Sequence, residues 1–309
     1  MKKLYLLTAL ICPAICFAQH NPIIHTQYSA DPSARVFGDT LYLYPSHDRD
    51  DSKTFDMIDY HVYTTTDMKT FTDRGVCFDA INDTPWAKAY AWAPDCIYRN
   101  GKYYFYYPTD KKHIGVAVAN SPLGPFHDAL GKPLVSIDSK GIICNRDFID
   151  PCVFIDDDGQ AYLFMGQNTI CCVKLNEDMI SYSEPVHIIE GCDEFFEAIW
   201  MHKYNGKYYL SYSNGTQNGH QPQIAYAIAD NPLGPYKYQG VILDPVSSGT
   251  NHHSIVEYKG KWWIFYHNSD LYISRNPQAG KEKGFRRSVC VDRLHYRKDG
   301  TIKKVRMTK

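Results

Sequence analysis

Acidic residues and histidines recur at one place in the pattern of this 309-residue chain, six to nine positions before a glycine that opens an aromatic-rich segment. In order, these residues are Asp31, Asp95, Asp150, Glu197 and the pair His252/His253. Carboxyl groups that lie close together can act as a general acid and a general base, because one keeps its proton while another is ionised. Burying such groups is costly unless they are paired or functional, so their recurrence favours a functional site. At a single position the alternative is a strand start, as in Asp31–Pro32 and Asp150–Pro151.

The glycines predict hairpins. The segments that contain them are FGDTLYLYP, NGKYYFYYP, DGQAYLFMG, NGKYYLSYS and KGKWWIFYH. Asx-Gly supplies the positive φ angles of a tight two-residue turn, and alternating aromatic residues are typical of a half-buried strand. The glycines, which are Gly38, Gly101, Gly159, Gly206 and Gly260, recur every 47 to 63 residues. This period suits a four-stranded sheet with its connections and predicts an all-β, five-bladed β-propeller.

A second repeat supports this interpretation. The segment SPLGPF at Ser121–Phe126 returns as NPLGPY at Asn231–Tyr236, in each case after a hairpin glycine. We interpret it as a shared outer-strand turn of blades two and four. The first strand of every propeller blade lines the central axis, so we expect the strand before each glycine to be innermost. The polar residues on these strands would then converge on one funnel.

Charge and composition narrow the class of ligand. The net charge is −1 and the pI is about 6.9, so the chain lacks the excess of positive charge that binding to a nucleic acid requires. The chain has 25 tyrosines, and aromatic residues in a funnel suit the C–H faces of sugars, so we expect an oligo- or polysaccharide substrate. No G-x-S-x-G, P-loop, G-x-G-x-x-G, H-E-x-x-H or C-x-x-C motif occurs.

The N-terminus is typical of an exported protein. Lys2 and Lys3 precede an apolar run from Leu4 to Cys16, and Ala18 ends the segment. We interpret residues 1–18 as a cleavable signal peptide and residues 19–309 as one catalytic domain, monomeric, periplasmic or extracellular, without membrane insertion of the mature chain. Lipidation at Cys16 is the less favoured alternative, because Ile15 is bulky for such a site. The eight cysteines of the mature chain are expected to be mostly buried free thiols.

Four segments resemble glycoside hydrolase family 43. They are Ser29–Asp48, Phe148–Gly166, Phe196–Ser213 and Thr250–Asn268, and they keep the motif order of the family over nearly the whole mature sequence. The resemblance implies a five-bladed propeller that hydrolyses arabinose- and xylose-containing glycans with inversion. It implies that Asp31 is the general base, that Glu197 is the general acid, and that Asp150 tunes and orients this acid. It also places His252 on the axis, where members often hold calcium or a water cluster.

Other residues are candidates for binding the substrate or a metal ion. Trp92 could stack on the sugar or be an ordinary core residue, and Arg287 resembles a position that reaches the terminal sugar, with a surface ion pair as the alternative. Asp95 could be a hydrogen-bonding partner near the axis or a cap at the start of its strand, and we favour the cap. The acidic stretch from His47 to Asp59 is expected to be a solvated loop, with surface calcium as the alternative. We expect no required cofactor, and any calcium near His252 to be held through water.

The resulting functional prediction is an exo-acting inverting hydrolase that releases terminal α-L-arabinofuranosyl or β-D-xylosyl residues. Aromatic residues beside Glu197, including Phe196 and Trp200, should raise the pKa of this acid, whereas Asp31 should stay ionised. An endo-arabinanase or a galactan-cleaving enzyme of the same family is one alternative. A non-catalytic glycan-binding propeller is another, although it would not need the three carboxylates.

Overall fold

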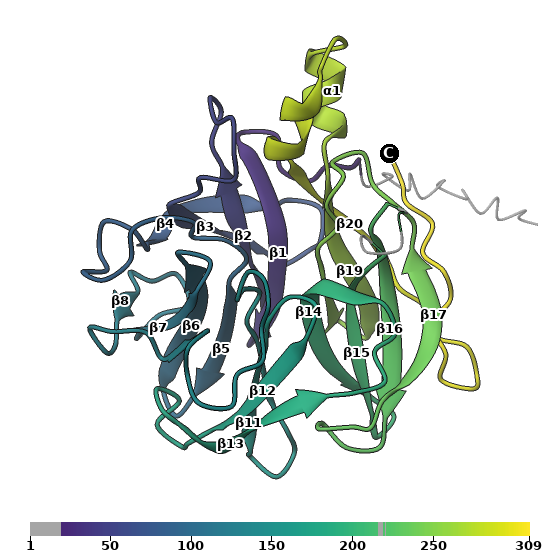
Figure 1. Cartoon of the computed structure of the whole chain (residues 1–309). Coiled ribbons are helices and arrows are strands. Elements are labelled where there is room, and N and C mark those ends of the chain that lie inside the picture. Colours follow the sequence, from purple (N-terminus) through teal and green to yellow (C-terminus); the bar gives the residue numbers. More distant parts are fainter. Residues whose placement is uncertain (1–19, 216–218, 220) are drawn as a thin grey trace, which may run out of the picture.

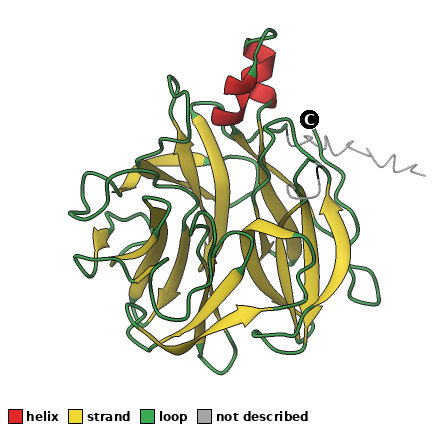
Figure 2. Cartoon of the chain, in the orientation of Figure 1, coloured by secondary structure: helices red, strands yellow, loops and turns green. Residues whose placement is uncertain are grey.

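The structure is a computed structural model that describes residues 20–215, 219 and 221–309. The predicted signal peptide therefore lies outside the described residues. The predicted all-β propeller is confirmed: five antiparallel sheets are arranged as blades around one axis (Figures 1 and 2). None of the helices in this part of the chain is long and apolar enough to cross a membrane.

Each blade is built from consecutive strands. Blade one is β1 (Tyr28–Phe37), β2 (Thr40–Asp48), β3 (Asp59–Thr65) and β4 (Thr72–Asp79). Blade two is β5 (Asp95–Arg99), β6 (Lys102–Thr109), β7 (His113–Ala119) and β8 (His127–Asp128), with β9 (Val135–Ser136) also paired to β7. Blade three is β10 (Cys152–Ile155), β11 (Ala161–Met165), β12 (Ile170–Leu175) and β13 (Tyr182–Ile189).

Blade four is β14 (Phe195–Tyr204), β15 (Lys207–Asn214), β16 (Gln223–Ala229) and β17 (Lys237–Leu243). Blade five is β18 (His253–Tyr258), β19 (Lys261–Asn268) and β20 (Ser288–Arg293). Between β19 and β20 the chain forms the short helix α1 (Asp270–Arg275) and the 3-10 helix η2 (Lys281–Phe285), which project from one end of the propeller (Figure 1).

The predicted turns lie where the glycine pattern placed them, between the first two strands of every blade. In blade two, Asn100 and Gly101 have φ angles of 49° and 81°, as a tight hairpin requires. The repeated Pro-Leu-Gly-Pro segments connect β7 to β8 and β16 to β17, so the predicted shared turn of blades two and four is confirmed.

The first strands of the blades are innermost, as predicted. Strand β1 contacts β5 and β18, while β10 contacts β5 and β14, and β14 also contacts β18. These contacts form a closed ring around the axis. Residues at the start of each first strand therefore come from distant parts of the sequence to one end of the same central space.

The N-terminal segment closes the ring beside blade five. The Ile23 N–H donates to the Val289 carbonyl at 2.8 Å, and the Ser29 N–H donates to the Arg287 carbonyl at 2.8 Å. These bonds satisfy backbone groups along β20 and hold β1 beside the last blade. The closure fixes Arg287, which precedes β20, next to the start of β1.

Aromatic residues fill the space between the blades. Tyr44 of blade one meets Phe105 of blade two edge to face, with ring centroids 5.7 Å apart. Such pairs add about 0.5–1.5 kcal/mol beyond the burial of their area. All eight cysteines of the described residues are free, and six of them are buried. The core therefore depends on aromatic packing without disulfides.

Candidate active site

Asp31 reaches the funnel through a distortion of β1. The pairing of β1 with β2 shifts register between Ala30 and Ser33, and Asp31 itself has a φ of 46°. A β-bulge of this kind redirects a side chain, and a positive φ on a residue other than glycine is strained. The Asp31 carboxylate consequently points into the funnel, where it lines the cavity.

Three cationic or imidazole side chains surround Asp31. The Arg287 Nη1 donates to Asp31 Oδ1 at 2.8 Å, and the Nδ1 atoms of His267 and His252 lie 3.4 and 3.8 Å from the same oxygen. Burial alone would raise the pKa of Asp31. The charge of Arg287, with contributions from the two histidines, outweighs burial and lowers this pKa to about 2. Asp31 is therefore ionised at neutral pH.

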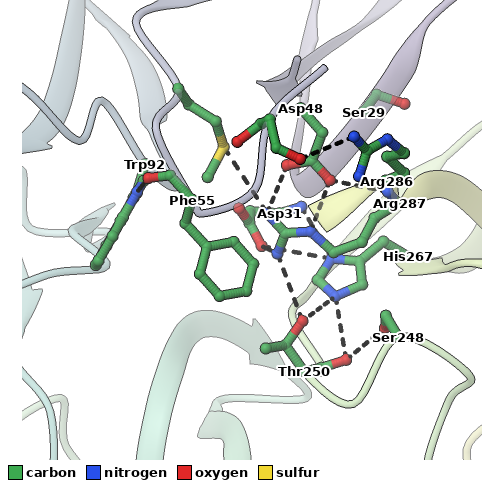
Figure 3. A network of polar contacts seen from close by, with 12 residues as sticks. Ser29, Asp31, Asp48, Phe55, Trp92, Ser248, Thr250, His267, Arg286 and Arg287 are labelled. Atoms are coloured by element: carbon green, nitrogen blue, oxygen red, sulfur yellow. Dashed lines mark hydrogen bonds and ion pairs between the residues drawn. The ribbon is translucent and has the colours of Figure 1, made fainter. Parts of the chain in front are cut away.

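Arg287 is clamped between two carboxylates (Figure 3). Its Nε and Nη2 donate to the two oxygens of Asp48, at 2.9 and 2.8 Å, while Nη1 reaches Asp31. The side chain of Arg287 is only 3% exposed. The surface ion pair considered for Arg287 is therefore wrong, because the pair is buried and lies at the wall of the site. This fork geometry fixes the guanidinium plane and orients Asp31.

His267 holds the backbone of Asp31. The Asp31 N–H donates to His267 Nδ1 at 3.0 Å, so this nitrogen is the unprotonated acceptor of the ring. The other nitrogen, Nε2, lies 3.2 Å from the Thr250 carbonyl and donates to it. Burial, followed by the charge of Arg287, lowers the pKa of His267 to about 3, which keeps the ring neutral. The neutral ring thereby fixes the strained conformation of Asp31.

Glu197 is presented by a second distorted strand. The pairing of β14 with β15 shifts register on both sides of Glu197, and the next residue, Ala198, has a φ of 63°. The Gln167 Nε2 donates to Glu197 Oε2 at 2.7 Å. Burial raises the pKa of Glu197 to about 7, although the bond from Gln167 acts in the opposite direction. Glu197 therefore has the opposite protonation preference to Asp31.

Asp150 lies between these two carboxylates in chain order and lines the same cavity. It too has a positive φ, of 57°, and its Oδ2 accepts the Ala198 N–H at 2.7 Å. Burial and the nearby charges of Glu197 and Asp31 raise the pKa of Asp150. Two neighbouring carboxylates resist being ionised at the same time, so the pair favours keeping a proton. The hydrogen bond to Ala198 also ties Asp150 to the backbone of the Glu197 bulge.

The two members of the histidine pair have different surroundings. His252 Nδ1 lies 3.8 Å from Asp31 Oδ1 and 3.8 Å from Asp150 Oδ2. Burial lowers the pKa of His252 to about 4, so it is a neutral ring between two carboxylates. His253 is buried away from the site, where its Nε2 lies 2.6 Å from Ser211 Oγ. Only the first histidine of the pair therefore belongs to the funnel.

Asp95 differs from the expected strand cap. It is buried, it forms a bidentate ion pair with Arg35, and it accepts hydrogen bonds from Ser33 Oγ at 2.7 Å and from the Val153 N–H at 2.7 Å. These partners belong to blades one and three. Because they occupy its oxygens, Asp95 joins three blades at the axis and does not line the candidate site.

The funnel opens into a cavity of about 570 Å³, within the range of small-molecule sites. Its lining includes the three carboxylates, His252 and Arg287. Aromatic and long side chains complete the wall: Phe55, Tyr90, Trp92, Lys111, Arg146, Phe196 and Phe285. Of the aromatic residues expected beside Glu197, Phe196 lines this cavity, whereas Trp200 lines a second cavity farther along the axis.

Trp92 stands in the cavity wall and is half-buried (Figure 3). Its indole Nε1 donates to the Phe55 carbonyl at 2.6 Å, which fixes the ring. Phe55 in turn meets Phe285 edge to face, with centroids 4.7 Å apart. The loop between β2 and β3 thus joins the η2 insertion of blade five and closes one side of the cavity.

The surroundings of His252 bear on the calcium expected from the resemblance. Calcium takes about six to eight oxygen ligands. Beside His252, one oxygen of Asp31 is bonded to Arg287 and one oxygen of Asp150 is bonded to the Ala198 amide. The protein oxygens at this point do not form a calcium coordination shell.

Three contributors to the site were not predicted: Asp48, Gln167 and His267. The expected solvated loop from His47 to Asp59 is wrong for Asp48, which is the last residue of β2 and is only 2% exposed. Each of the three lies within two residues of the end of the second strand of its blade, where an aromatic-rich segment gives way to polar residues. Tyr28 of β1, for example, pairs with Asp48 of β2. A search for polar residues at the ends of second strands would have found all three.

The chain matches known proteins over most of its length. The family model for glycosyl hydrolases family 43 matches residues 19–302. A xylosidase/arabinosidase of Humicola insolens is 37% identical, over 91% of this chain and 98% of that protein. The structure of an α-L-arabinofuranosidase from Clostridium thermocellum is 43% identical, with a TM-score of 0.79 over 93% of this chain and 96% of that one. A β-xylosidase/α-arabinofuranosidase from a compost microbial metagenome, in complex with xylotriose and calcium-free, is 38% identical, with a TM-score of 0.80 over 93% and 97%.

Proposed function

The chain belongs to glycosyl hydrolase family 43 and is a glycoside hydrolase of the β-xylosidase/α-arabinofuranosidase class, and from this premise we propose that it releases single terminal sugars from plant cell-wall glycans with inversion. The observation that carries the proposal is the opposed protonation of two carboxylates in one cavity. The pKa of Asp31 is lowered to about 2 and that of Glu197 is raised to about 7. At a pH between these values the site holds one base and one acid.

The reaction is a single displacement. Water attacks the anomeric carbon of the terminal sugar as Asp31 takes one of its protons, and the bond from this carbon to the leaving oxygen breaks as Glu197 protonates that oxygen. Asp31 leaves the cycle protonated and Glu197 ionised, and exchange with solvent restores both. Asp150 acts through the position of Glu197, because its Oδ2 accepts the Ala198 N–H at 2.7 Å and so holds the bulge that presents the acid.

Arg287, Trp92 and His252 complete the binding of the sugar. Arg287 fixes the base, and the N–H groups of its guanidinium that are not bonded to Asp31 or Asp48 can donate to hydroxyl groups of the terminal sugar. Trp92 presents an apolar face for the C–H groups of the ring. His252, neutral between two carboxylates, can both accept and donate a hydrogen bond. A calcium ion near His252 would be held through water and is not required for the displacement.

Closure of the cavity supports exo action. The contact of Phe55 with Phe285, together with bonds from Arg286 to the carbonyls of Asp50 and Ser52 at 2.8 Å, joins loops of blades one and five across one side. A glycan chain cannot continue past that side. One terminal sugar therefore enters the closed end, and the remainder of the chain extends toward solvent.

Export and a monomeric state are part of the proposal. A signal peptide at residues 1–18 would deliver the mature chain to the periplasm or the medium, where plant glycans are found. Two related structures hold xylotriose, including one from Xanthomonas citri. These complexes support xylo-oligosaccharides as ligands of this chain.

A panel of substrates tests the function. The purified chain 19–309 is incubated with p-nitrophenyl β-D-xylopyranoside, p-nitrophenyl α-L-arabinofuranoside, xylotriose and linear arabinan, with Asp31→Asn as the inactive control. We expect turnover of at least one aryl glycoside and release of single sugars from the matching oligosaccharide. Release of oligosaccharides from within arabinan would refute exo action, and binding without turnover of any substrate would refute hydrolysis.

A further inference from the structure

A group of metal-binding side chains lies outside the candidate active site, on blade one. His47, Asp59 and His61 each offer one ligand atom, and the three atoms lie within 4.8 Å of one another. In the described ranges of the chain, no other set of three His, Cys, Asp or Glu side chains meets this condition. The mechanism proposed above uses none of these residues.

The strands place the three side chains on one face of the blade. His47 is the second-last residue of β2, and Asp59 and His61 are the first and third residues of β3. Alternate residues of a strand share a face, so Asp59 and His61 point the same way. The imidazole rings of His47 and His61 meet edge to face with centroids 5.2 Å apart. The cluster therefore lies on two neighbouring, hydrogen-bonded strands, β2 and β3.

Contacts already hold the ligands near one another. His47 Nδ1 lies 2.7 Å from Asp59 Oδ1, and His61 Nδ1 lies 3.1 Å from Asp73 Oδ1 on the neighbouring strand β4. The side chains of His47, Asp59 and His61 are 24%, 17% and 15% exposed. Partial exposure allows an ion to enter, while the surrounding blade limits how far each side chain can turn.

We propose that His47, Asp59 and His61 form a site for a divalent transition-metal ion, for which zinc is the probe. Two imidazoles and one carboxylate suit zinc and related ions, whereas calcium prefers oxygen ligands. Bonds of about 2.0–2.2 Å in tetrahedral geometry separate ligand atoms by about 3.3 Å. The ligand atoms lie within 4.8 Å of one another, and His47 Nδ1 is 2.7 Å from Asp59 Oδ1, so small side-chain rotations are enough to close the site, with water in the fourth position.

A metal ion at this site would stabilise the end of β2. Asp48 follows His47 directly, and its carboxylate holds Arg287 through two hydrogen bonds. An ion shared between β2 and β3 would stabilise the folded chain, because it binds the native state in preference to the unfolded one. This inference does not depend on the identity of the sugar substrate or on hydrolysis.

Zinc binding to chain 19–309 is measured by isothermal titration calorimetry, with calcium titrated separately. We expect one zinc ion per chain and a melting temperature raised by roughly 5 °C at a zinc concentration 100-fold above the Kd. His61→Asn should weaken zinc binding at least about tenfold, whereas His127→Asn, at an exposed position of β8, should leave it unchanged.

Two further variants separate this site from others. The half-buried thiols of Cys144 and Cys192 could also take zinc, so the double variant Cys144→Ser/Cys192→Ser must retain the binding. His252→Ala must retain it as well. The visible spectrum of bound cobalt reports the coordination directly, and it should vanish in His61→Asn while the circular dichroism stays native. Zinc binding that survives in a folded His61→Asn variant, or no stoichiometric binding in the wild-type chain, would overturn the proposal.

Discussion

Replacement of Glu197 by glutamine is expected to remove the proton that the leaving group needs and to preserve the shape of the site. The glutamine side-chain oxygen can still accept the bond from Gln167 that Glu197 accepts at 2.7 Å. A positioned acid contributes about 10² to 10⁴ in rate, so kcat/KM on xylotriose or an arabino-oligosaccharide should fall by this factor. This loss corresponds to roughly 3 to 5 kcal/mol of activation free energy.

Leaving-group dependence is the first check on this role. A nitrophenolate leaves with little help from an acid, so the aryl glycoside should lose less than about tenfold in kcat/KM. Glu190→Gln is the matched control, because Glu190 is exposed and lies outside the cavity. Equal losses on the aryl glycoside and the oligosaccharide would refute the assignment of Glu197 as the acid.

The pH profile gives a second check. The pKa of Glu197 is raised to about 7, so the activity of the wild-type chain should fall as the pH rises through about 7. Glu197→Gln should lose this alkaline limb on the aryl substrate. A limb that persists in the variant would assign the titration to another group, such as Asp150.

The same shift predicts a change in stability. The folded pKa of Glu197, about 7, exceeds the unfolded value of 4.5, so its stabilising contribution is complete below pH 4.5 and is lost as the pH rises through about 7. The loss amounts to roughly 3 kcal/mol. The free energy of unfolding of Glu197→Gln, measured with urea from pH 4 to pH 8, should lack this decline.

Four further predictions concern the stereochemistry of the product, Arg287, a metal ion and His252. If Asp31 activates water, proton NMR of the fresh product should show an inverted anomeric configuration, and a retained configuration or a trapped glycosyl-enzyme would contradict the single displacement. Arg287→Met should leave Asp48 buried without its partner and lower the free energy of unfolding, measured with urea, by about 3–5 kcal/mol. The same variant should move the acid limb of the pH–activity profile to higher pH, because Arg287 is the principal group that lowers the pKa of Asp31. A limb that stays in place in a folded variant would show that the histidines dominate. Dialysis against EDTA should reduce activity only in part, and complete loss that calcium alone restores would show that a metal is essential. His252→Ala should lower kcat and leave the melting temperature nearly unchanged.

Much of the fold could be predicted from local physical chemistry. Asx-Gly turns and alternating aromatic residues are properties of a few neighbouring residues, and their spacing along the chain is the spacing of blades. The innermost position of each first strand followed from this period. The three carboxylates Asp31, Asp150 and Glu197 were predicted because each stands in the same place in its repeat.

The sequence by itself thus determined the architecture and the positions of the carboxylates, because both repeat with the blades. Only the tertiary structure decided the partners and the protonation preference of each carboxylate. Asp95 occupies the equivalent place in its repeat, yet Arg35 and the amide of Val153 bind its oxygens and turn it into a link between blades. Protonation is set by partners from other blades, as Arg287 sets it for Asp31. Such partners are brought together by closure of the ring, which the local sequence pattern does not encode.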